Sequence, residues 1–179
     1  MLVAALAACL ASATAANAAT PEPLFSGPSA GGGAWAVSGE HMSSGVITGI
    51  CLHVSATLAD GSSAGQTKNC VAGVLHGVHN VFPVVGRSGA GAGTKAYVIG
   101  GVTVSQARTV HFTFANGSHA QTTTRKAPEG WGAMMGAQVS YFAADLLASS
   151  RSRLRSITVY DRRHRRVGRT SHVSVATLR

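Results

Sequence analysis

The sequence has few acidic residues and few aromatic residues. Only 6 of its 179 residues are Asp or Glu, and aromatic residues make up 6% of the chain. This scarcity argues against reactions that need two carboxylates held across a substrate, such as glycoside hydrolysis. Apolar residues make up 45% and charged residues 12%, which argues against a disordered chain and fits one globular domain with a single core.

The shortage of acids leaves a strong excess of positive charge. There are 15 Lys and Arg residues, so the formal net charge is +9 and the pI is near 10.5. A protein with this balance is attracted to anionic surfaces and polymers.

The first 18 residues are predicted to be a secretory signal peptide. They hold an apolar run over 2–10 and end in Ala16-Asn17-Ala18, an A-x-A cleavage pattern. A membrane-spanning helix needs about 20 predominantly apolar residues, so we expect no transmembrane span in the mature chain. The protein is therefore predicted to be secreted. LAAC at 6–9 also resembles a lipobox, and a lipid anchor on Cys9 is the alternative if translation starts upstream.

Cysteines are scarce as well, with only three in the chain. Removal of Cys9 with the signal peptide leaves Cys51 and Cys70, and an oxidising compartment would allow them to form a disulfide. The alternative is a pair of free thiols in a cytosolic protein. Two cysteines without a C-x-x-C motif cannot supply a zinc site unaided, and the sequence predicts no metal site and no cofactor.

The mature chain divides into a leader and one domain. Residues 19–33 are rich in proline and glycine and predict a flexible leader, so the domain spans 34–179. In the domain, apolar residues alternate with polar ones, most clearly over 50–58, which places Cys51 on the face opposite the aliphatic side chains. Similar strand-like runs occupy 71–75, 81–85, 96–104, 110–114, 119–125, 139–143, 156–160 and 167–173.

The connections between these runs favour an antiparallel fold. Asn116-Gly117 is a strong hairpin signal because both residues tolerate positive φ; Asn116-Gly117-Ser118 is also formally a glycosylation acceptor, although a turn explains it. A turn of helix is predicted at 143–149, and 126–132 is a loop. Strands at intervals of about ten residues predict an all-β fold, an antiparallel β-sandwich of immunoglobulin-like or related type, or a barrel.

Short catalytic motifs lack the context that their chemistry needs. Gly27 to Gly31 matches G-x-S-x-G, but a nucleophile elbow requires a strand before it and a helix after it. His76 and His79 would point to opposite faces of a strand, and the glycines of 89–93 lack the spacing of a nucleotide site. We therefore predict no catalytic residue, while a dispersed Ser/His/Asp triad stays open.

The clearest functional signal is a cluster of arginines near the C-terminus. Between residues 151 and 169 there are eight arginines and one Asp, a formal charge of +7. Guanidinium groups match the geometry of phosphate and carboxylate groups, so these arginines are predicted to contact an anion. The alternative is that they keep sheet edges apart and the protein soluble. The predicted contact residues are Arg151, Arg153, Arg155, Arg162, Arg163, Arg165, Arg166 and Arg169.

TVHFTFANG at 109–117 and SITVYDRRHRRVGR at 156–169, with the Cys51 and Cys70 pair and the export signal, resemble small exported β-sandwich proteins of high-GC Gram-positive bacteria. The resemblance covers about 35–173 and rests on hairpin patterns. It implies a fold and a location, and it implies no activity.

The leading hypothesis is an exported, non-catalytic domain that binds an anionic polymer of the cell wall or membrane surface, or a protein partner. A specific nucleic-acid partner is not expected after export. The alternatives are a small secreted hydrolase with a dispersed Ser/His/Asp site and a secreted protease inhibitor that uses the loop from Gly86 to Lys95.

Overall fold

The computed structural model describes residues 21–30, 32–44, 46–73, 80–89, 94–149, 152–171 and 173–178. Strands make up 67% of it, and the described residues contain one short helix, so the prediction of an all-β fold is confirmed. The elements in chain order are β1 (Glu22–Pro28), β2 (Ala34–Ser44), β3 (Ile47–Thr57), β4 (Ser63–Ala72), β5 (Val81–Gly89), β6 (Thr94–Val104), β7 (Thr109–Phe114), β8 (His119–Thr123), β9 (Arg125–Lys126), α1 (Trp131–Met134), β10 (Val139–Ser149), β11 (Leu154–Tyr160), β12 (Arg166–Thr170) and β13 (Ala176–Thr177).

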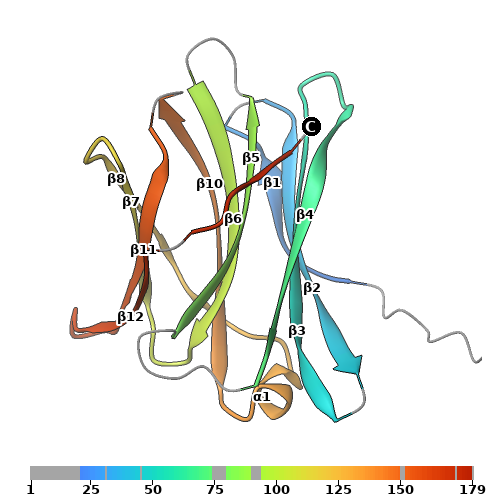
Figure 1. Ribbon diagram of the computed structural model, residues 1–179, viewed down its shortest axis with the longest axis vertical. Coiled ribbons are helices and arrows are strands. Elements are labelled where there is room, and N and C mark those ends of the chain that lie inside the picture. Colours follow the sequence, from blue (N-terminus) through green and yellow to red (C-terminus); the bar gives the residue numbers. More distant parts are fainter. Residues whose placement is uncertain are drawn as a thin grey trace, which may run out of the picture.

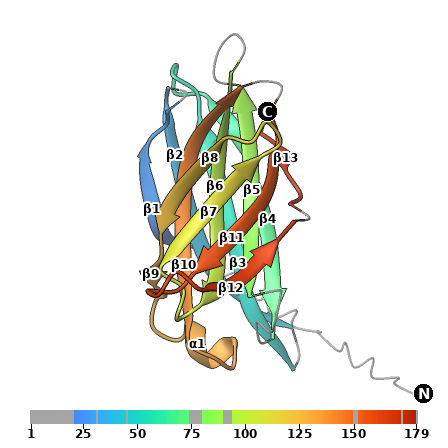
Figure 2. The ribbon, with the colours of Figure 1, turned by 90° about the vertical axis from the view of Figure 1, so that its left-hand side faces the viewer.

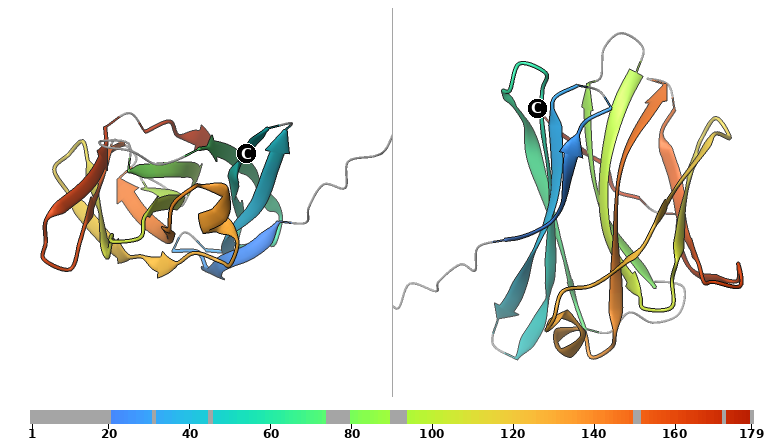
Figure 3. Two further views of the ribbon diagram at one scale, coloured as in Figure 1. Left: turned by 90° about the horizontal axis from the view of Figure 1, so that it is seen from below. Right: turned by 180° about the vertical axis from the view of Figure 1, so that it is seen from behind.

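The strands form three sheets stacked face to face (Figures 1 and 3). Sheet A has the order β1-β2-β3-β4, sheet B has β13-β5-β6-β10-β9, and sheet C has β12-β11-β7-β8. Sheet B lies in the middle. All pairs of neighbouring strands are antiparallel except β13 and β5, which are parallel.

The stack contains two hydrophobic cores, whereas the sequence analysis expected one. The first core lies between sheets A and B and contains Val37, Ile50 and Leu52 of sheet A with Val98 and Val102 of sheet B. The second core lies between sheets B and C and is more aromatic, with Tyr97, Phe112, Phe114 and Phe142 among its members. Each layer is a single sheet of only four or five strands. Three such layers fit in a chain of this length, and they enclose two cores between them.

The central strand β6 is apolar on both faces, as a strand covered on both sides must be. Tyr97 and Ile99 point into the second core, and the intervening Val98 points into the first. Two glycines follow. A Cβ at Gly100 would lie 2.6 Å from Val37 Cγ1, and one at Gly101 would lie 2.1 Å from Phe142 Cζ. The layers pack closely because these two positions carry no side chain.

The prediction of a flexible leader at 19–33 is wrong for residues 22–28, because these residues form strand β1. β1 pairs with β2 along its length and occupies the edge of sheet A, where prolines are tolerated. Phe25 stacks on Trp35 with ring centroids 5.2 Å apart, and Trp35 Nε1 donates to the Pro28 carbonyl at 3.1 Å. The predicted signal peptide at 1–18 lies outside the described residues.

Two local predictions in the second half of the chain also need correction. Residues 143–149 were expected to form a turn of helix, but they continue β10, which pairs with β6 as far as Ser149 and Thr94; this pairing overrides the helix propensity of Ala and Leu. The predicted loop at 126–132 leads into α1, where Trp131 is fully buried. A Cβ at Gly39 would lie 2.3 Å from the Trp131 ring, so the ring packs directly on the backbone of β2.

The predicted hairpin at Asn116-Gly117 is confirmed, and it joins β7 to β8. Gly117 has φ of 84°, while Asn116 does not have positive φ. The Gly117 amide donates to the Phe114 carbonyl at 3.0 Å, and Asn116 Oδ1 accepts from the Ser118 amide at 3.0 Å. The turn therefore needs a left-handed residue at Gly117 alone.

Among the described residues, no helix is both long enough and apolar enough to cross a membrane.

Candidate anion-binding surfaces

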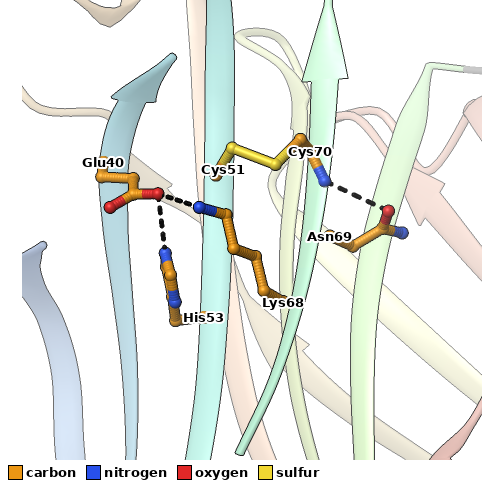
Figure 4. The surroundings of a disulfide bond; sticks show 6 residues. All are labelled: Glu40, Cys51, His53, Lys68, Asn69 and Cys70. Atoms are coloured by element: carbon orange, nitrogen blue, oxygen red, sulfur yellow. Dashed lines mark hydrogen bonds and ion pairs between the residues drawn. A yellow bond between two sulfur atoms is a disulfide. The ribbon is translucent and has the colours of Figure 1, made fainter. Parts of the chain in front are cut away.

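The predicted disulfide is present and joins Cys51 of β3 to Cys70 of β4 (Figure 4). The two residues are direct cross-strand partners and lie on the outer face of sheet A, as the alternation along β3 predicts. Cys51 is only 2% exposed because Glu40 and Cys70 flank it on the two neighbouring strands. The bridge ties the edge strand β4 to the interior of sheet A.

A compensated group of charges surrounds this disulfide. Glu40 Oε1 accepts a hydrogen bond from Lys68 Nζ and lies 3.2 Å from His53 Nε2 (Figure 4). The hydrogen bond from Lys68 lowers the pKa of Glu40; burial opposes this shift, and His53 adds to it. The ammonium group of Lys68 therefore already has an acid beside it.

The predicted arginine hairpin is formed by β11 and β12, and its turn is organised by Asp161. Asp161 Oδ1 accepts from the backbone amides of Arg163 at 2.8 Å and Arg165 at 3.0 Å. Asp161 Oδ2 accepts from Arg165 Nε at 2.8 Å. The backbone amide of Arg165 lowers the pKa of Asp161, burial opposes the shift, and the Arg165 side chain lowers it further. Both carboxylate oxygens of Asp161, the one acid of this segment, therefore accept hydrogen bonds within the turn.

The structure separates the predicted anion contacts into two groups. Arg153 lies just before strand β11 of sheet C and Arg155 lies at its start, and both line a hollow of about 460 Å³. The turn and the first residue of β12 carry Arg162, Arg163, Arg165 and Arg166 at the other end, and β11 spans roughly 20 Å at about 3.3 Å per residue. Arg169 lies between them, opposite Thr158, and Arg151 lies outside the described residues. All seven described arginines are exposed.

A second cationic site, which the sequence analysis missed, lies beside the turn. The Arg108 amide donates to the Tyr160 carbonyl at 2.7 Å, one residue before Asp161, and β9 lies at the same end of the molecule (Figure 2). Here a cleft of about 570 Å³ contains three cations and no acid. It is lined by Ser105, Gln106, Arg108, Thr124, Arg125, Lys126, Gln138, Val139 and Ser140.

Neutral groups hold the two arginines of this cleft in place. Arg108 Nη1 donates to the carbonyls of Ser105 and Ala107, both at 2.8 Å. The Arg125 guanidinium carbon lies 4.3 Å from the centroid of the Phe25 ring. Within the described ranges, the ion pairs involve only Glu40 and Asp161 as acids, so neither arginine of the cleft is neutralised by a described carboxylate.

The described residues give no support to the remaining candidate motifs. His76 and His79 lie outside the described residues, as do 90–93 of the loop proposed for protease inhibition. Gly27 of the G-x-S-x-G match belongs to β1, so no strand-turn-helix elbow is present there. The described residues contain no group of three His, Cys, Asp or Glu side chains arranged to hold a metal.

Comparisons with protein-family models, with curated proteins and with solved structures give no match for this chain. The described residues form an all-β stack of three sheets with one disulfide.

Proposed function

We propose that this protein is an exported, non-catalytic domain that binds an anionic polymer of the cell envelope. The binding surface is the cationic end of the molecule, where the β11–β12 turn and the cleft beside β9 lie together. The observation that carries the proposal is a contrast in ion pairing. Glu40 and Asp161 are paired with Lys68 and Arg165, while the two arginines of the cleft, Arg108 and Arg125, contact neutral groups.

Exposed arginines of this kind suit a polymer better than a single small anion. Arg162, Arg163 and Arg166 are exposed around one short turn, and their fork-shaped donors match phosphate and carboxylate groups. Exposed charges act over about 8–10 Å at physiological ionic strength. A chain of regularly spaced anions can engage several of these arginines at once, which increases its apparent affinity.

Export is part of the proposal. The disulfide between Cys51 and Cys70 is the kind of bond that persists in oxidising compartments, and the first 18 residues have the pattern of a signal peptide. Both features support a location outside the cytoplasm, where wall polymers and anionic head groups are the available polyanions.

The test is binding of the mature chain to soluble polyanions at low and at physiological salt, for the wild type and for two matched variants. Arg162→Gln/Arg163→Gln removes two charges from the turn, and Arg153→Gln/Arg155→Gln removes two from the opposite end of β11. By analogy with phosphate contacts on nucleic acids, we expect the turn variant to bind roughly tenfold more weakly at low salt, with a salt dependence reduced by about two counterions. The matched variant should lose much less.

The same arginines also lie next to β12, which is an edge strand of sheet C, and edge charges prevent sheets from pairing between molecules. If the turn variant keeps full affinity for every polyanion but aggregates, the arginines protect the edge and the proposed function is wrong. Binding that is lost equally in both variants would also contradict it, because net charge alone would then explain the attraction.

A further inference from the structure

The cleft beside β9 has a lining that is unusual for a ligand site. Pockets for small molecules are mostly apolar with a few polar groups. Here Val139 is the single apolar residue, and the rest of the lining consists of three cations, two amides and three hydroxyls. Nearly every residue of this lining therefore offers a hydrogen bond or a positive charge. The lining suits a ligand that carries negative charge and several hydrogen-bonding groups.

Part of this lining is fixed before any ligand arrives. Thr124 Oγ1 donates to the Ala107 carbonyl at 2.7 Å, and Arg108 donates to the carbonyls of Ser105 and Ala107. The Arg125 guanidinium rests on Phe25, which in turn stacks on Trp35. Groups that are already ordered lose less conformational entropy on binding, so this end of the molecule holds its charges in a defined arrangement.

The polar lining also includes groups that are free to bind hydroxyls. Gln106 and Gln138 are exposed, and each amide can both donate and accept. The volume of about 570 Å³ falls within the range of about 300–1,000 Å³ that is typical of small-molecule sites. It therefore accommodates more than a bare phosphate ion, and the amides suit the hydroxyls of a polyol or sugar.

We infer that this cleft binds one phosphate-bearing polyol or sugar unit, with Arg108, Arg125 and Lys126 facing the phosphate and Gln106 and Gln138 facing the hydroxyls. The inference rests on the proposed function, because it names the ligand class at the same cationic end. The cleft then gives selectivity for phosphate polymers over carboxylate polymers, while the arginines of the β11–β12 turn supply attraction to both.

The first experiment locates the site with small probes. Backbone amide NMR shifts of the mature chain are followed during titration with glycerol 3-phosphate, inorganic phosphate and glycerol. We expect saturable shifts with glycerol 3-phosphate at residues 105–108, 124–126 and 138–140, and binding at least about threefold tighter than inorganic phosphate because the amides add contacts. Shifts confined to 162–166, or equal binding of the two phosphates, would overturn the inference.

The second experiment separates the cleft from the turn with variants of equal charge. Arg125→Gln/Lys126→Gln is expected to weaken binding of oligo(glycerol phosphate) about tenfold, because charge-assisted hydrogen bonds to phosphate are lost, and to weaken binding of oligogalacturonate about twofold. Arg162→Gln/Arg163→Gln should weaken both oligomers alike. Equal losses on both oligomers for the cleft variant would show that the cleft does not select phosphate.

Because Arg125 contacts Phe25, its replacement could disturb β1, and a charge-neutral variant provides an independent test. Gln138→Leu changes an exposed side chain without changing the net charge. It should weaken binding of glycerol 3-phosphate and leave binding of oligogalacturonate unchanged. Unchanged binding of glycerol 3-phosphate in this variant would contradict the role given to the amide.

The outcomes distinguish the two proposals. If the wild type binds neither oligomer, the proposed function fails. If it binds both with equal affinity, the proposed function stands and the inference about the cleft fails. Vesicles of phosphatidylglycerol identify the source of the phosphate: binding to vesicles that is sensitive to Gln138→Leu supports a lipid head group, and binding to the soluble oligomer alone supports a polymer.

Discussion

Sheets A and C cover opposite faces of the same central sheet, yet their charged residues differ in how they are paired. On sheet A, Glu40 lies between Lys68 and His53, next to a disulfide. On sheet C, Asp161 is the one acid of the β11–β12 turn and is bound to Arg165, while Arg162 and Arg163 are exposed. The comparison separates charges that stabilise the fold from charges that are available to a ligand.

The two outer sheets are also attached to sheet B in different ways. Sheet A contributes mainly aliphatic side chains to the first core and has a covalent link between β3 and β4. Sheet C contributes Phe112 and Phe114 to a core that also contains Phe142, and its described strands have no such link. We therefore expect sheet A to depend on its disulfide and sheet C to depend on aromatic packing.

The largest effect on stability is expected from removal of the disulfide. Cys51→Ala/Cys70→Ala should lower the free energy of unfolding by roughly 3 kcal/mol, since a loop of this size is no longer closed in the unfolded chain. Urea unfolding of this variant, and of the wild type with and without reductant, measures the loss. Binding of polyanions by the folded variant should be unchanged. A loss of binding would show that the two outer sheets are not independent.

The next effect comes from the two glycines of β6, which test the two cores separately. Gly101→Ala forces the Phe142 ring to move within the second core, and Gly100→Ala presses on Val37 in the first. Overpacking of this kind costs about 1–3 kcal/mol. We expect Gly101→Ala to be the more destabilising in thermal or urea unfolding, because an aromatic ring yields less easily than a valine methyl. The reverse order would mean that the aromatic core is the looser one.

The smallest effect concerns the charges of sheet A and depends on pH. The lowered pKa of Glu40 means that its ionised form contributes stability above its ordinary pKa of 4.5, and that this contribution is lost as the pH falls. At pH 7, Glu40→Gln should lower the free energy of unfolding by about 0.5–1 kcal/mol.

Once the pH has fallen below the lowered pKa of Glu40, the wild type and the Glu40→Gln variant should be equally stable. Glu129→Gln, at an exposed position without an ion pair among the described residues, is the matched control and should have little effect. A Glu40→Gln effect that persists at low pH would mean that the cluster acts through packing.

Local patterns were sufficient to predict much of the fold. The alternation over 50–58 predicted β3 and the face on which Cys51 lies, and Asn116-Gly117 predicted the β7–β8 hairpin. Composition failed at 22–28 because the contacts that order β1, with Trp35 above all, come from β2. It failed at 143–149 because pairing with β6 decides the conformation there.

The third layer was not predicted, although β6 carries a signal for it. Its sequence from Ala96 to Val104 is apolar at nearly every position, which indicates a strand buried on both faces. A run of this kind predicts a strand, and its second apolar face requires a further layer to cover it. The order of strands within the sheets depends on pairings between distant segments, which periodicity does not encode.

The candidate site was predictable only in part. The density of arginines after residue 150 is visible in the sequence, but their division between the two ends of β11 follows from the length of that strand. The cleft could not be found in this way, because its residues come from separate segments around 105–108, 124–126 and 138–140. Only folding brings Arg108 and Arg125 to one cleft.

Strand β6 has a hydrogen-bonded neighbour on each side and a packed core on each face. Its amide hydrogens can exchange with solvent deuterium only when the layers separate, so their exchange rates should report global unfolding. The outer strands β1 and β12 each have one neighbour, and their amides should exchange through local opening long before the central ones.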